Sequence, residues 1–510
     1  MLLNTIPALI RQMMEPDFYP HLVKERIELV QTHISYVLLT GNYAYKVKKS
    51  VNFGFLDFSP LPARQYFCQE ELRLNQVNAP EIYLEVLPIT KTGDKFTLNG
   101  AGEIVEYALK MKQFSQAGLL GNLLQQGKLT GAQLEELGRV VAQFHAQAHR
   151  SNYINTFGSV SQIRKAFDEN YQQTKKYLGS VQTPLQYEET KQFTDDFFTQ
   201  EKELLVARQN QGWIRECHGD LHLDNICLWQ NKILLFDRIE FNESFRFVDV
   251  MYDIAFTVMD LQAQGHQDLS YIFLNSYIEQ TGDWQGLEIL PLYLSRQAYV
   301  RAKVNSFLLN ESDVTPEAKA KARRNAAHYY NLAWQYTRSH DGKLILMSGL
   351  SGSGKTTVAR YLAQKLGAIQ IRSDALRKHL AGIPLAQSGN QEIYTPQMSE
   401  KTYRCLLELG IKLARRGFKV ILDAKYDQQQ LRAAAISQAQ FYNIPLEIIH
   451  CSAPESILRD RLLTRTGDIS DATLDLLKKQ QATAEAFTEL ESNLVTTVDT
   501  SQNWQKQLLI

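Results

Sequence analysis

Eight consecutive residues in the last third of the chain have the types and spacing of a phosphate-binding loop. They fit GxxxxGK(S/T) between a predicted strand and a predicted helix, and read Gly349-Leu350-Ser351-Gly352-Ser353-Gly354-Lys355-Thr356. Glycines let backbone N–H groups turn toward phosphate oxygens, and the helix start adds positive potential. Lys355 is expected to reach the β and γ phosphates of ATP, and the Thr356 hydroxyl to hold Mg²⁺. The expected ATP contacts are Gly349, Ser351, Gly352, Ser353, Gly354, Lys355, Thr356 and Thr357.

Two carboxylates and an arginine downstream of this loop have the types needed for phosphoryl transfer. Asp374 and Arg377 are three residues apart in a predicted helix, which places them on one face. Asp374 could accept the proton of an attacking hydroxyl, and Arg377 could hold an anionic part of the acceptor. Asp374 could instead only cap the helix. Asp423 ends a predicted strand, where a carboxylate orders Mg²⁺ or its water in P-loop enzymes.

Two arginines farther along have the spacing of a lid over the phosphates. Arg461 and Arg465 are four residues apart in the polar helix predicted over Glu455–Arg465. From one helix face they could close over a nucleotide and stabilise the charge of the transferred group. The alternative is an arginine face that is only solvated.

A second group of chemistry-bearing residues lies in the first part of the chain. His218, Asp220 and Asn225 have HxDxxxxN spacing, and Asp237 follows at the end of a short predicted strand. In such a loop Asp220 would accept the substrate hydroxyl's proton, while Asn225 and Asp237 would coordinate Mg²⁺. The alternative is a Zn²⁺ or Mn²⁺ site of a metallohydrolase, formed by His218, Asp220, His222 and Asp224.

The predicted elements divide into a mixed first part and an alternating second part. The first part starts as a small β-rich lobe with one helix and becomes mostly helical after about residue 119. Its main predicted elements are strands Ile27–Val30, Tyr36–Leu39, Ala44–Val47, Ile226–Trp229 and Ile233–Phe236 and helices Arg64–Gln76, Leu134–His149 and Asp195–Arg208. The second part alternates strands with helices, which favours a parallel sheet covered by helices. Its predicted strands are Leu344–Ser348, Ala368–Arg372, Lys419–Asp423 and Leu446–Cys451.

These patterns predict two domains joined by a short linker. We expect one domain over residues 1–337, a linker over 338–342 and a second domain over 343–510. Within the first domain the N-lobe is expected over about 20–112 and the C-lobe over about 113–337. The predicted fold class is an α+β protein-kinase-like bilobal domain followed by an α/β P-loop NTPase domain with a parallel sheet.

The second part resembles a group of P-loop kinases over roughly Lys343 to Ile510. The group includes polynucleotide 5′-hydroxyl kinases, zeta-toxin-like kinases and gluconate-kinase-like enzymes, and the phosphate-binding loop carries most of the likeness. In that group the aspartate matching Asp374 serves as the base. The resemblance leaves the acceptor open, because the group phosphorylates nucleic acids, sugars and small metabolites.

The first part resembles the aminoglycoside phosphotransferase/choline kinase family, whose loop reads HGDxHxxN with a later metal aspartate. The resemblance covers roughly Ile27 to Tyr330. It implies that His218 braces the loop, that Asp220 is the base, and that Asn225 and Asp237 are metal ligands. It also implies a phosphate lysine at Lys46, with Lys48 as runner-up, paired with Glu71, with Glu70 as its rival. One departure is the loop Gln31–Ser35, which should cover the phosphates but contains no glycine.

The acceptor of the first part is open in the sequence. Asp249, Asp253 and Asp260 follow the catalytic segment and could form an acidic pocket for a cationic acceptor. An opposite set would suit an anionic acceptor and consists of Arg296, Tyr299, Arg301 and Lys303 on a predicted helix.

Bulk composition excludes some classes of protein and leaves others. Lys+Arg and Asp+Glu both number 55 among 510 residues, so no global basic field recruits nucleic acid. No apolar run approaches the ~18 residues of a membrane span, and no signal-peptide pattern starts the chain. The five scattered cysteines are typical of reduced thiols, and we expect a cytoplasmic protein.

The sequence thus predicts a bifunctional kinase that uses ATP and Mg²⁺ at two unrelated sites and phosphorylates unidentified hydroxyl acceptors. A resemblance to predicted bifunctional proteins with this domain order covers nearly the whole chain. Nucleic acid is a possible acceptor for the second domain only, and no membrane partner is expected. The rival hypothesis is a nucleotide-gated regulator or scaffold in which one domain binds ATP without productive transfer.

Overall fold

The computed structural model describes residues 6–23, 26–54, 56–312, 314–389, 391–464, 469–470 and 474–508. The chain forms two compact units, each built from several segments. The first unit comprises Met1–Leu129, Gln147–Ile163 and Leu205–Thr257, and the second comprises Thr130–Ala146, Arg164–Leu204 and Val258–Ile510.

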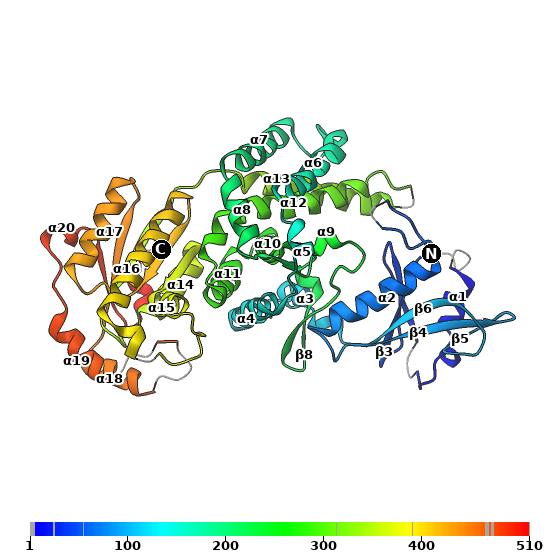
Figure 1. The fold of residues 1–510 in the computed structure, drawn as a ribbon, viewed down its shortest axis with the longest axis horizontal. Helices are drawn as coiled ribbons and strands as arrows, with labels where there is room; N and C mark the ends of the chain where they lie inside the picture. The colour runs from blue at the N-terminus through cyan, green and yellow to red at the C-terminus, as the bar shows by residue number, and fades with distance from the viewer. Residues whose placement is uncertain are drawn as a thin grey trace. The chain divides into compact units, whose positions relative to one another are not determined.

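The first unit contains a six-stranded sheet in the order β1-β2-β3-β6-β4-β5. Its neighbouring strands are antiparallel. The strands are β1 Glu28–Gln31, β2 Ser35–Leu39, β3 Tyr43–Lys48, β4 Tyr83–Thr92, β5 Lys95–Leu98 and β6 Glu103–Lys112. Helix α2, Leu61–Gln76, packs against β4 and β6 and runs along the sheet (Figure 1). The short helix α1, Ala8–Met13, contributes Ile10 and Met13 to the core under β2 and β3.

The remaining parts of the first unit are short hairpins and helices. Strands β8 Ile226–Trp229 and β9 Lys232–Leu235 form a hairpin, and β7 Ile214–Glu216 pairs with β10 Phe247–Asp249. The hairpin turn uses Gln230 and Asn231 at φ values of 50° and 61°, the left-handed region that tight two-residue turns require. The helices are α3 Leu120–Gln125, α5 Asn152–Thr156, α8 Lys202–Asn210 and α9 Glu243–Arg246.

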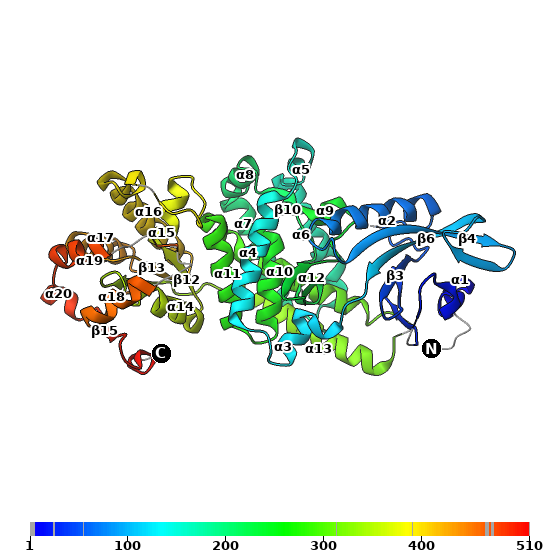
Figure 2. The ribbon, with the colours of Figure 1, turned by 90° about the horizontal axis from the view of Figure 1, so that it is seen from below.

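The second unit contains a five-stranded parallel sheet in the order β12-β13-β11-β14-β15, which confirms the predicted parallel sheet. The strands are β11 Lys343–Ser348, β12 Ala368–Arg372, β13 Lys419–Asp423, β14 Leu446–Ser452 and β15 Val495–Asp499. Helices α14 Lys355–Leu366 and α16 Pro396–Arg415 lie on opposite sides of β13 (Figure 2). Because both faces are covered, the central strands are apolar and buried almost throughout.

The other helices belong to the second unit or cross a boundary between the units along the chain. They are α4 Gly131–Gln147, α6 Val160–Thr174, α7 Pro184–Gln200, α10 Val250–Ala263, α11 Gln267–Thr281, α12 Leu290–Phe307, α13 Pro316–Gln335, α15 Ser373–Leu380, α17 Gln429–Phe441, α18 Glu455–Thr464, α19 Leu474–Thr483 and α20 Glu489–Ser492. The prediction of one continuous helix over Asp195–Arg208 is wrong, because the helix is interrupted at Glu201, between α7 and α8. Residues 339–342 carry no helix or strand.

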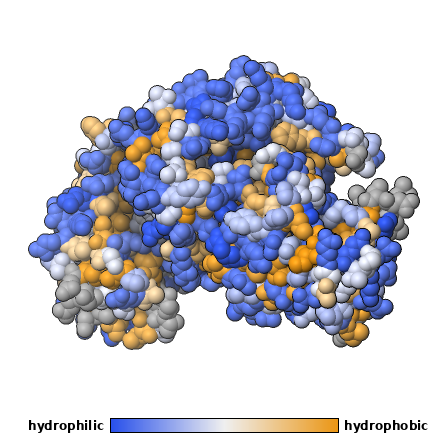
Figure 3. Space-filling view, turned by 45° about the vertical axis from the view of Figure 1, so that its right-hand side comes forward, coloured by the Kyte–Doolittle hydropathy of each residue, from blue (hydrophilic) through white to orange (hydrophobic). Residues whose placement is uncertain are grey.

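The surface seen in Figure 3 is mostly hydrophilic, with smaller hydrophobic areas between the polar ones. Within the described ranges, no helix has both the length and the apolar character needed to cross a membrane.

Candidate active sites

A cluster of lysines and carboxylates joins β3, α2 and the segment after β9 in the first unit. Lys46 Nζ lies 2.7 Å from Glu71 Oε1 and 2.7 Å from Asp237 Oδ1. Lys48, two residues on and therefore on the same strand face, pairs with Glu71 Oε2 at 2.6 Å and with Glu240. The side chains of Lys48 and Glu71 are at most 1% exposed, whereas Asp237 is 44% exposed. Lys46 therefore joins the buried cluster to an open carboxylate.

Opposite charges keep Lys46 and Glu71 ionised despite their burial. Burial alone would lower the pKa of Lys46, but the charges of Asp237, Glu71 and Glu240 outweigh it and raise the pKa well above its usual value. For Glu71, burial raises the pKa, and the opposing lysines bring it below its usual range. Glu70 lies outside the cluster and instead pairs with Arg73 and Arg246. Of the pairs left open by the sequence, the structure brings Glu71 to both lysines and Glu70 to neither.

The segment after β7 holds the predicted base Asp220 and the predicted metal ligand Asn225, and the other predicted metal ligand, Asp237, follows β9. Asn225 Nδ2 donates to Asp220 Oδ2 at 3.1 Å and to the Asp220 carbonyl at 3.0 Å, which leaves the amide oxygen of Asn225 for a cation. His222 Nε2 lies 3.4 Å from Asp220 Oδ2. Asp237 has a φ of 61° and donates its backbone N–H to Tyr83 Oη at 3.0 Å. This left-handed turn, uncommon outside glycine, ends the hairpin at the carboxylate.

His218 is buried beneath this loop and uses both ring nitrogens. Its Nδ1 accepts the backbone N–H of Asp220 at 3.3 Å, and Nε2 lies 2.9 Å from the Phe236 carbonyl. Burial lowers the pKa of His218 to about 4, so the ring is neutral, with Nε2 as donor and Nδ1 as acceptor. Because neither nitrogen is left for a metal ion, the arrangement disfavours the metallohydrolase alternative.

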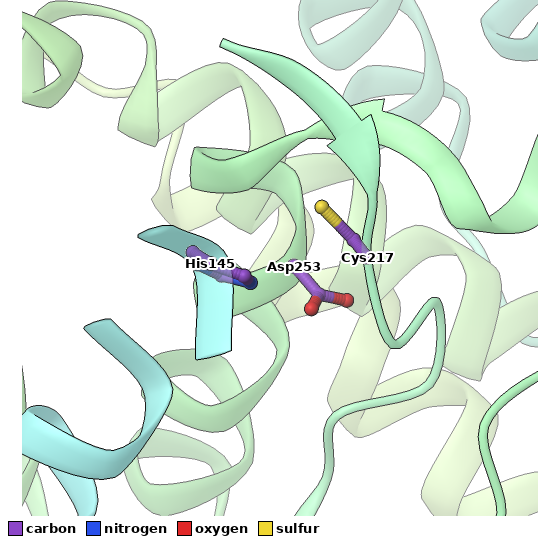
Figure 4. Close-up of side chains that lie close together, drawn as sticks. All are labelled: His145, Cys217 and Asp253. Carbon is purple, nitrogen blue, oxygen red and sulfur yellow. The ribbon is translucent and has the colours of Figure 1, made fainter. Parts of the chain in front are cut away.

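The sequence left open an acidic acceptor pocket formed by Asp249, Asp253 and Asp260, but the carboxylate of Asp253 in α10 is engaged elsewhere. Its two carboxylate oxygens accept the backbone N–H groups of His218 and Gly219 at 2.9 and 2.8 Å, and Figure 4 shows the carboxylate directed toward the chain that follows Cys217. Asp249 is equally committed, to buried Arg208 at 2.6 Å. Asp253 therefore holds the loop in shape, Asp249 ties β10 to α8, and both carboxylates are buried.

The cationic side chains that would suit an anionic acceptor are also engaged in packing contacts. Tyr299 is buried and hydrogen-bonded to Thr174, and Lys303 donates to Asn170 at 2.6 Å. The Arg296 guanidinium stacks over Phe167 at 5.0 Å. These side chains hold α12 to its neighbours in the second unit.

The glycine-free turn between β1 and β2 is closed by a threonine. Thr32 Oγ1 accepts the backbone N–H of Ser35 at 3.0 Å, and the Thr32 N–H donates to the Ser35 carbonyl at 3.0 Å. The Thr32 hydroxyl is therefore engaged in the turn itself.

In the second unit, the phosphate-binding loop connects β11 to α14 and depends on its glycines. Gly349 and Gly352 have φ values of 132° and 80°. A Cβ on Gly349 would lie 2.3 Å from the Cys451 carbonyl oxygen, and one on Gly352 would lie 2.8 Å from that of Leu458. Only glycine fits both conformations and both contacts. Lys355 opens α14 and donates to the Leu350 carbonyl at 2.8 Å, Thr356 follows it, and Thr357 is exposed.

Carboxylates surround Lys355 at the carboxyl edge of the parallel sheet. Burial lowers the pKa of Lys355, and the charges of Asp423, Asp374 and Asp427 oppose that shift. Asp423 ends β13 and accepts from Gln370 Nε2 of the neighbouring strand at 2.9 Å. Asp427, four residues later, was not singled out from the sequence, because the loop after a strand has no pattern that marks such a residue.

Asp374 and Arg377 both lie in α15, as predicted, but Arg377 is held by hydrogen bonds to other segments of the second unit. Asp374 is the second residue of α15 and the N-cap is Arg372, so the capping alternative for Asp374 is not what the structure has. Arg377 is buried, donates to the Ile393 carbonyl and to Ser399 Oγ at 3.2 Å each, and stacks over Tyr394. Its contacts hold the start of α16.

The predicted arginine lid is attached to the loop it was expected to cover. Arg461 donates to the Gly352 carbonyl at 3.2 Å and to Oγ1 and the carbonyl of Thr500 at 2.9 and 2.8 Å. Arg465 lies outside the described residues. A residue missed from the sequence, Gln480 of α19, accepts the backbone N–H of Ser351 through Oε1 at 2.9 Å. This N–H belongs to the phosphate-binding loop.

Comparisons with known proteins give one family match, in the C-terminal part of the chain. Residues 344–487 match a family model described as AAA domain. Two relatives are uncharacterized proteins of Mycobacterium bovis and Mycobacterium tuberculosis, each 29% identical over 464 residues that cover 90% of this chain and 90% of the relative.

Two solved structures are similar to different shares of this chain. A sugar kinase from a Janibacter species is 24% identical and covers 32% of this chain and 90% of its own, with a TM-score of 0.25. A choline/ethanolamine kinase family protein from Mesorhizobium loti is 8% identical and covers 65% of this chain and 99% of its own, with a TM-score of 0.39. Residues 344–487 of this chain thus combine a match to the AAA domain model with a phosphate-binding loop whose conformation requires glycine.

Proposed function

We propose that this chain is a bifunctional ATP-dependent phosphotransferase, with one site in residues 1–337 and another in residues 343–510. Each site would transfer the γ-phosphate of ATP to a hydroxyl. The first would use a small-molecule acceptor, and the second a small molecule or a nucleic-acid 5′-hydroxyl. The observation that carries the proposal is Lys355 in a glycine-shaped loop, with Asp423, Asp374 and Asp427 close enough to oppose the lowering of its pKa by burial.

At the second site each residue type suits one part of the reaction. The loop N–H groups and Lys355 would bind the phosphates, and Asp374 is our candidate for the base that takes the acceptor's proton. Thr356 and Asp423 offer the hydroxyl and carboxylate oxygens that Mg²⁺ prefers, and the ion would neutralise charge on the transferred group. Arg461, already bonded to Gly352, would stabilise the loop that holds the phosphates.

At the first site Lys46 would bind the phosphates from β3, supported by Glu71. Asp220 would take the proton of the acceptor, and His218 would hold the backbone of that residue in place. Asn225 and Asp237 supply the oxygen ligands suited to Mg²⁺, whose charge would assist transfer. The support for this half is the convergence of Lys46, Glu71 and Asp237 from three separate elements.

Transfer of labelled γ-phosphate tests the proposal directly. Wild-type protein and the variants Asp220→Ala and Lys355→Ala are incubated with ATP, Mg²⁺ and a panel of aminoglycosides, amino alcohols, sugars, nucleosides and 5′-hydroxyl oligonucleotides. Labelling lost only in Asp220→Ala assigns that acceptor to the first site, and labelling lost only in Lys355→Ala assigns it to the second. If both sites bind ATP and no acceptor is labelled, a nucleotide-gated regulator becomes the better account.

A further inference from the structure

A pocket of about 260 Å³ lies beside the phosphate-binding loop, within the second unit. It is bordered by the end of β11, the loop after β13, the end of β14 and the segment after α19. Its described lining comprises Ser348, Gly349, Leu350, Ser353, Asp427, Arg432, His450, Cys451, Ser452, Ala453, Leu458, Gln481, Ala484, Glu485 and Phe487. The contacts described above account for the loop residues but give the pocket itself no role.

Asp427 presents an unsatisfied oxygen in this lining. The residue is 5% exposed, and its Oδ2 accepts from Lys425 Nζ at 3.2 Å. Its Oδ1 is buried and has no hydrogen-bond partner among the described residues. A buried carboxylate oxygen without a donor is costly, and native proteins seldom keep one without a reason. Ser353, 1% exposed, also has a buried hydroxyl without a described partner.

The charges around the pocket select against anions. Arg432 is the one arginine or lysine in the described lining, and it is fully buried and paired with Glu491 Oε1 at 2.7 Å. Its other N–H groups donate to the carbonyls of Tyr426, Glu485 and Ala486. Asp427 and Glu485 contribute negative charge to the same lining. An anionic ligand would therefore meet carboxylates and no uncommitted cation among these residues.

We propose that this pocket receives the phosphoryl acceptor of the second site and selects uncharged or cationic hydroxyl compounds, because the acceptor donates a hydrogen bond to Asp427 Oδ1. The inference rests on the proposed function of that site. The pocket adjoins Gly349 and Leu350, so a bound hydroxyl lies beside the loop that binds the phosphates. A sugar, an amino sugar or an amino alcohol offers the required donors, and the ring of Phe487 offers an apolar wall.

The transfer itself balances without another reactant. The acceptor oxygen forms a bond to the γ-phosphorus while the bond from that phosphorus to the β–γ bridging oxygen breaks. ADP leaves with the electron pair of the broken bond, and the hydroxyl proton passes to a carboxylate of the site. Asp427 in this scheme positions the acceptor, and Asp374 remains the candidate base.

The test compares acceptors matched in size and different in charge. The full chain carrying Asp220→Ala, which silences the first site, is supplied with ATP and Mg²⁺. One set is glucose, glucosamine and glucuronate, another is ethylene glycol, ethanolamine and glycolate, and a 5′-hydroxyl oligonucleotide extends the anionic group. Labelled acceptor and released ADP are both measured. In whichever set is phosphorylated faster, kcat/KM for the neutral or cationic member should exceed that of the anionic member by about tenfold or more.

Two variants and one control locate the selection. Asp427→Asn should raise the acceptor KM about tenfold or more, since a hydrogen bond to a charged partner is lost, and should change the KM for ATP much less than the acceptor KM. Gln481→Arg, at an exposed lining position, should increase kcat/KM for anionic members by placing an uncommitted cation there. Asp460→Asn removes an exposed carboxylate of α18 outside the lining and should change neither constant.

The outcomes separate this inference from the function on which it rests. Preference for an anionic member, or an acceptor KM unchanged by Asp427→Asn, overturns the acceptor pocket. ADP release that depends on Lys355 without labelling of any neutral or cationic acceptor also overturns it, while ATP use at the second site stands. If Lys355→Ala changes neither ADP release nor labelling, the proposed function of the second site fails, and this inference fails with it.

Discussion

Lys46 Nζ lies 2.7 Å from Asp237 Oδ1, so the lysine of β3 directly contacts the carboxylate that follows the β8–β9 hairpin. Two residues away, Lys48 has no such opening, because both of its carboxylate partners are buried. Neighbouring lysines on one strand face therefore have different surroundings. One borders the exposed carboxylate proposed to hold Mg²⁺, and the other stabilises the interior.

This difference predicts different consequences of removing each charge. Lys46→Met should weaken MgATP binding at the first site about tenfold or more, since a charged contact to phosphate is lost. Lys48→Met should instead reduce the free energy of unfolding by about 3–5 kcal/mol, because Glu71 and Glu240 stay buried with less compensation. MgATP titration and urea unfolding, both in a Lys355→Ala background, measure the two effects. Loss of MgATP binding in Lys48→Met with unchanged unfolding would contradict this division.

His218 should make the stability of the first unit depend on pH. Burial lowers its pKa to about 4, whereas an exposed histidine has a pKa of 6.5. Between these values the unfolded chain binds a proton that the folded chain does not, so stability is fully present above pH 6.5 and falls as the pH drops toward 4. The loss between pH 7 and pH 5 should be roughly 2 kcal/mol.

Urea unfolding at pH 7 and pH 5 measures this loss against two variants. His218→Gln, which cannot titrate, should be less stable at pH 7 and should lack this part of the pH dependence. His33→Gln changes an exposed histidine and should keep the wild-type dependence. Equal pH dependence in all three proteins would show that His218 is not responsible.

The parallel sheet was largely predictable, and its last strand shows where prediction stopped. Apolar runs identified β11, β12, β13 and β14, since strands buried on both faces must be apolar. The edge strand β15 reads Val-Thr-Thr-Val-Asp and is only partly buried, so its sequence carries no such run. Each of its residues pairs with a residue of β14 47 positions earlier in the chain, such as Val495 with Ile448, and short-range patterns do not report that pairing.

In the candidate sites too, contacts within a motif could be predicted and contacts between distant residues could not. Residues within one motif, such as Asp220 and Asn225, are fixed by spacing, and they lie in contact. Which of Lys46 and Lys48 contacts the exposed carboxylate of Asp237, and which contacts only buried carboxylates, depends on long-range pairing that no local pattern gives. Asp253 is a residue type that suits a pocket for a cationic acceptor, yet its carboxylate accepts backbone N–H groups 34 and 35 residues earlier in the chain. Such long-range pairing decides whether a carboxylate is open or committed.

Gln480 should compete with ATP for the phosphate-binding loop. Its Oε1 accepts the Ser351 N–H at 2.9 Å, and a bound phosphate would need that donor. Gln480→Ala should therefore tighten ATP binding at the second site by about two- to tenfold, the range of one neutral hydrogen bond. Isothermal titration with MgATP in a Lys46→Met background, which weakens ATP binding at the first site, measures this change. Lys479→Ala, an exposed neighbour in α19, is the control, and weaker binding in Gln480→Ala would mean that Gln480 supports the nucleotide.

Two arginines with similar ring contacts should differ widely in their effect on stability. Arg432 lies 4.6 Å from the Phe487 ring centre and is 0% exposed, whereas Arg415 lies 4.5 Å from that of Tyr442 and is exposed. Arg432→Met leaves Glu491 and several carbonyls buried without their donor, so the free energy of unfolding should fall by about 3–5 kcal/mol. Arg415→Met removes only a solvated contact and should cost about 1 kcal/mol or less.

Urea unfolding of both variants, with the double variant Arg432→Met/Glu491→Met, tests whether pairing or packing is responsible. Glu491 accepts from Arg432 at 2.7 and 3.2 Å, so removal of both charges takes away the uncompensated carboxylate that the single variant leaves behind. The double variant should therefore be more stable than Arg432→Met alone. If it is less stable, the arginine acts mainly through Phe487 and the carbonyls, and the pocket wall beside Asp427 depends on packing rather than on the ion pair.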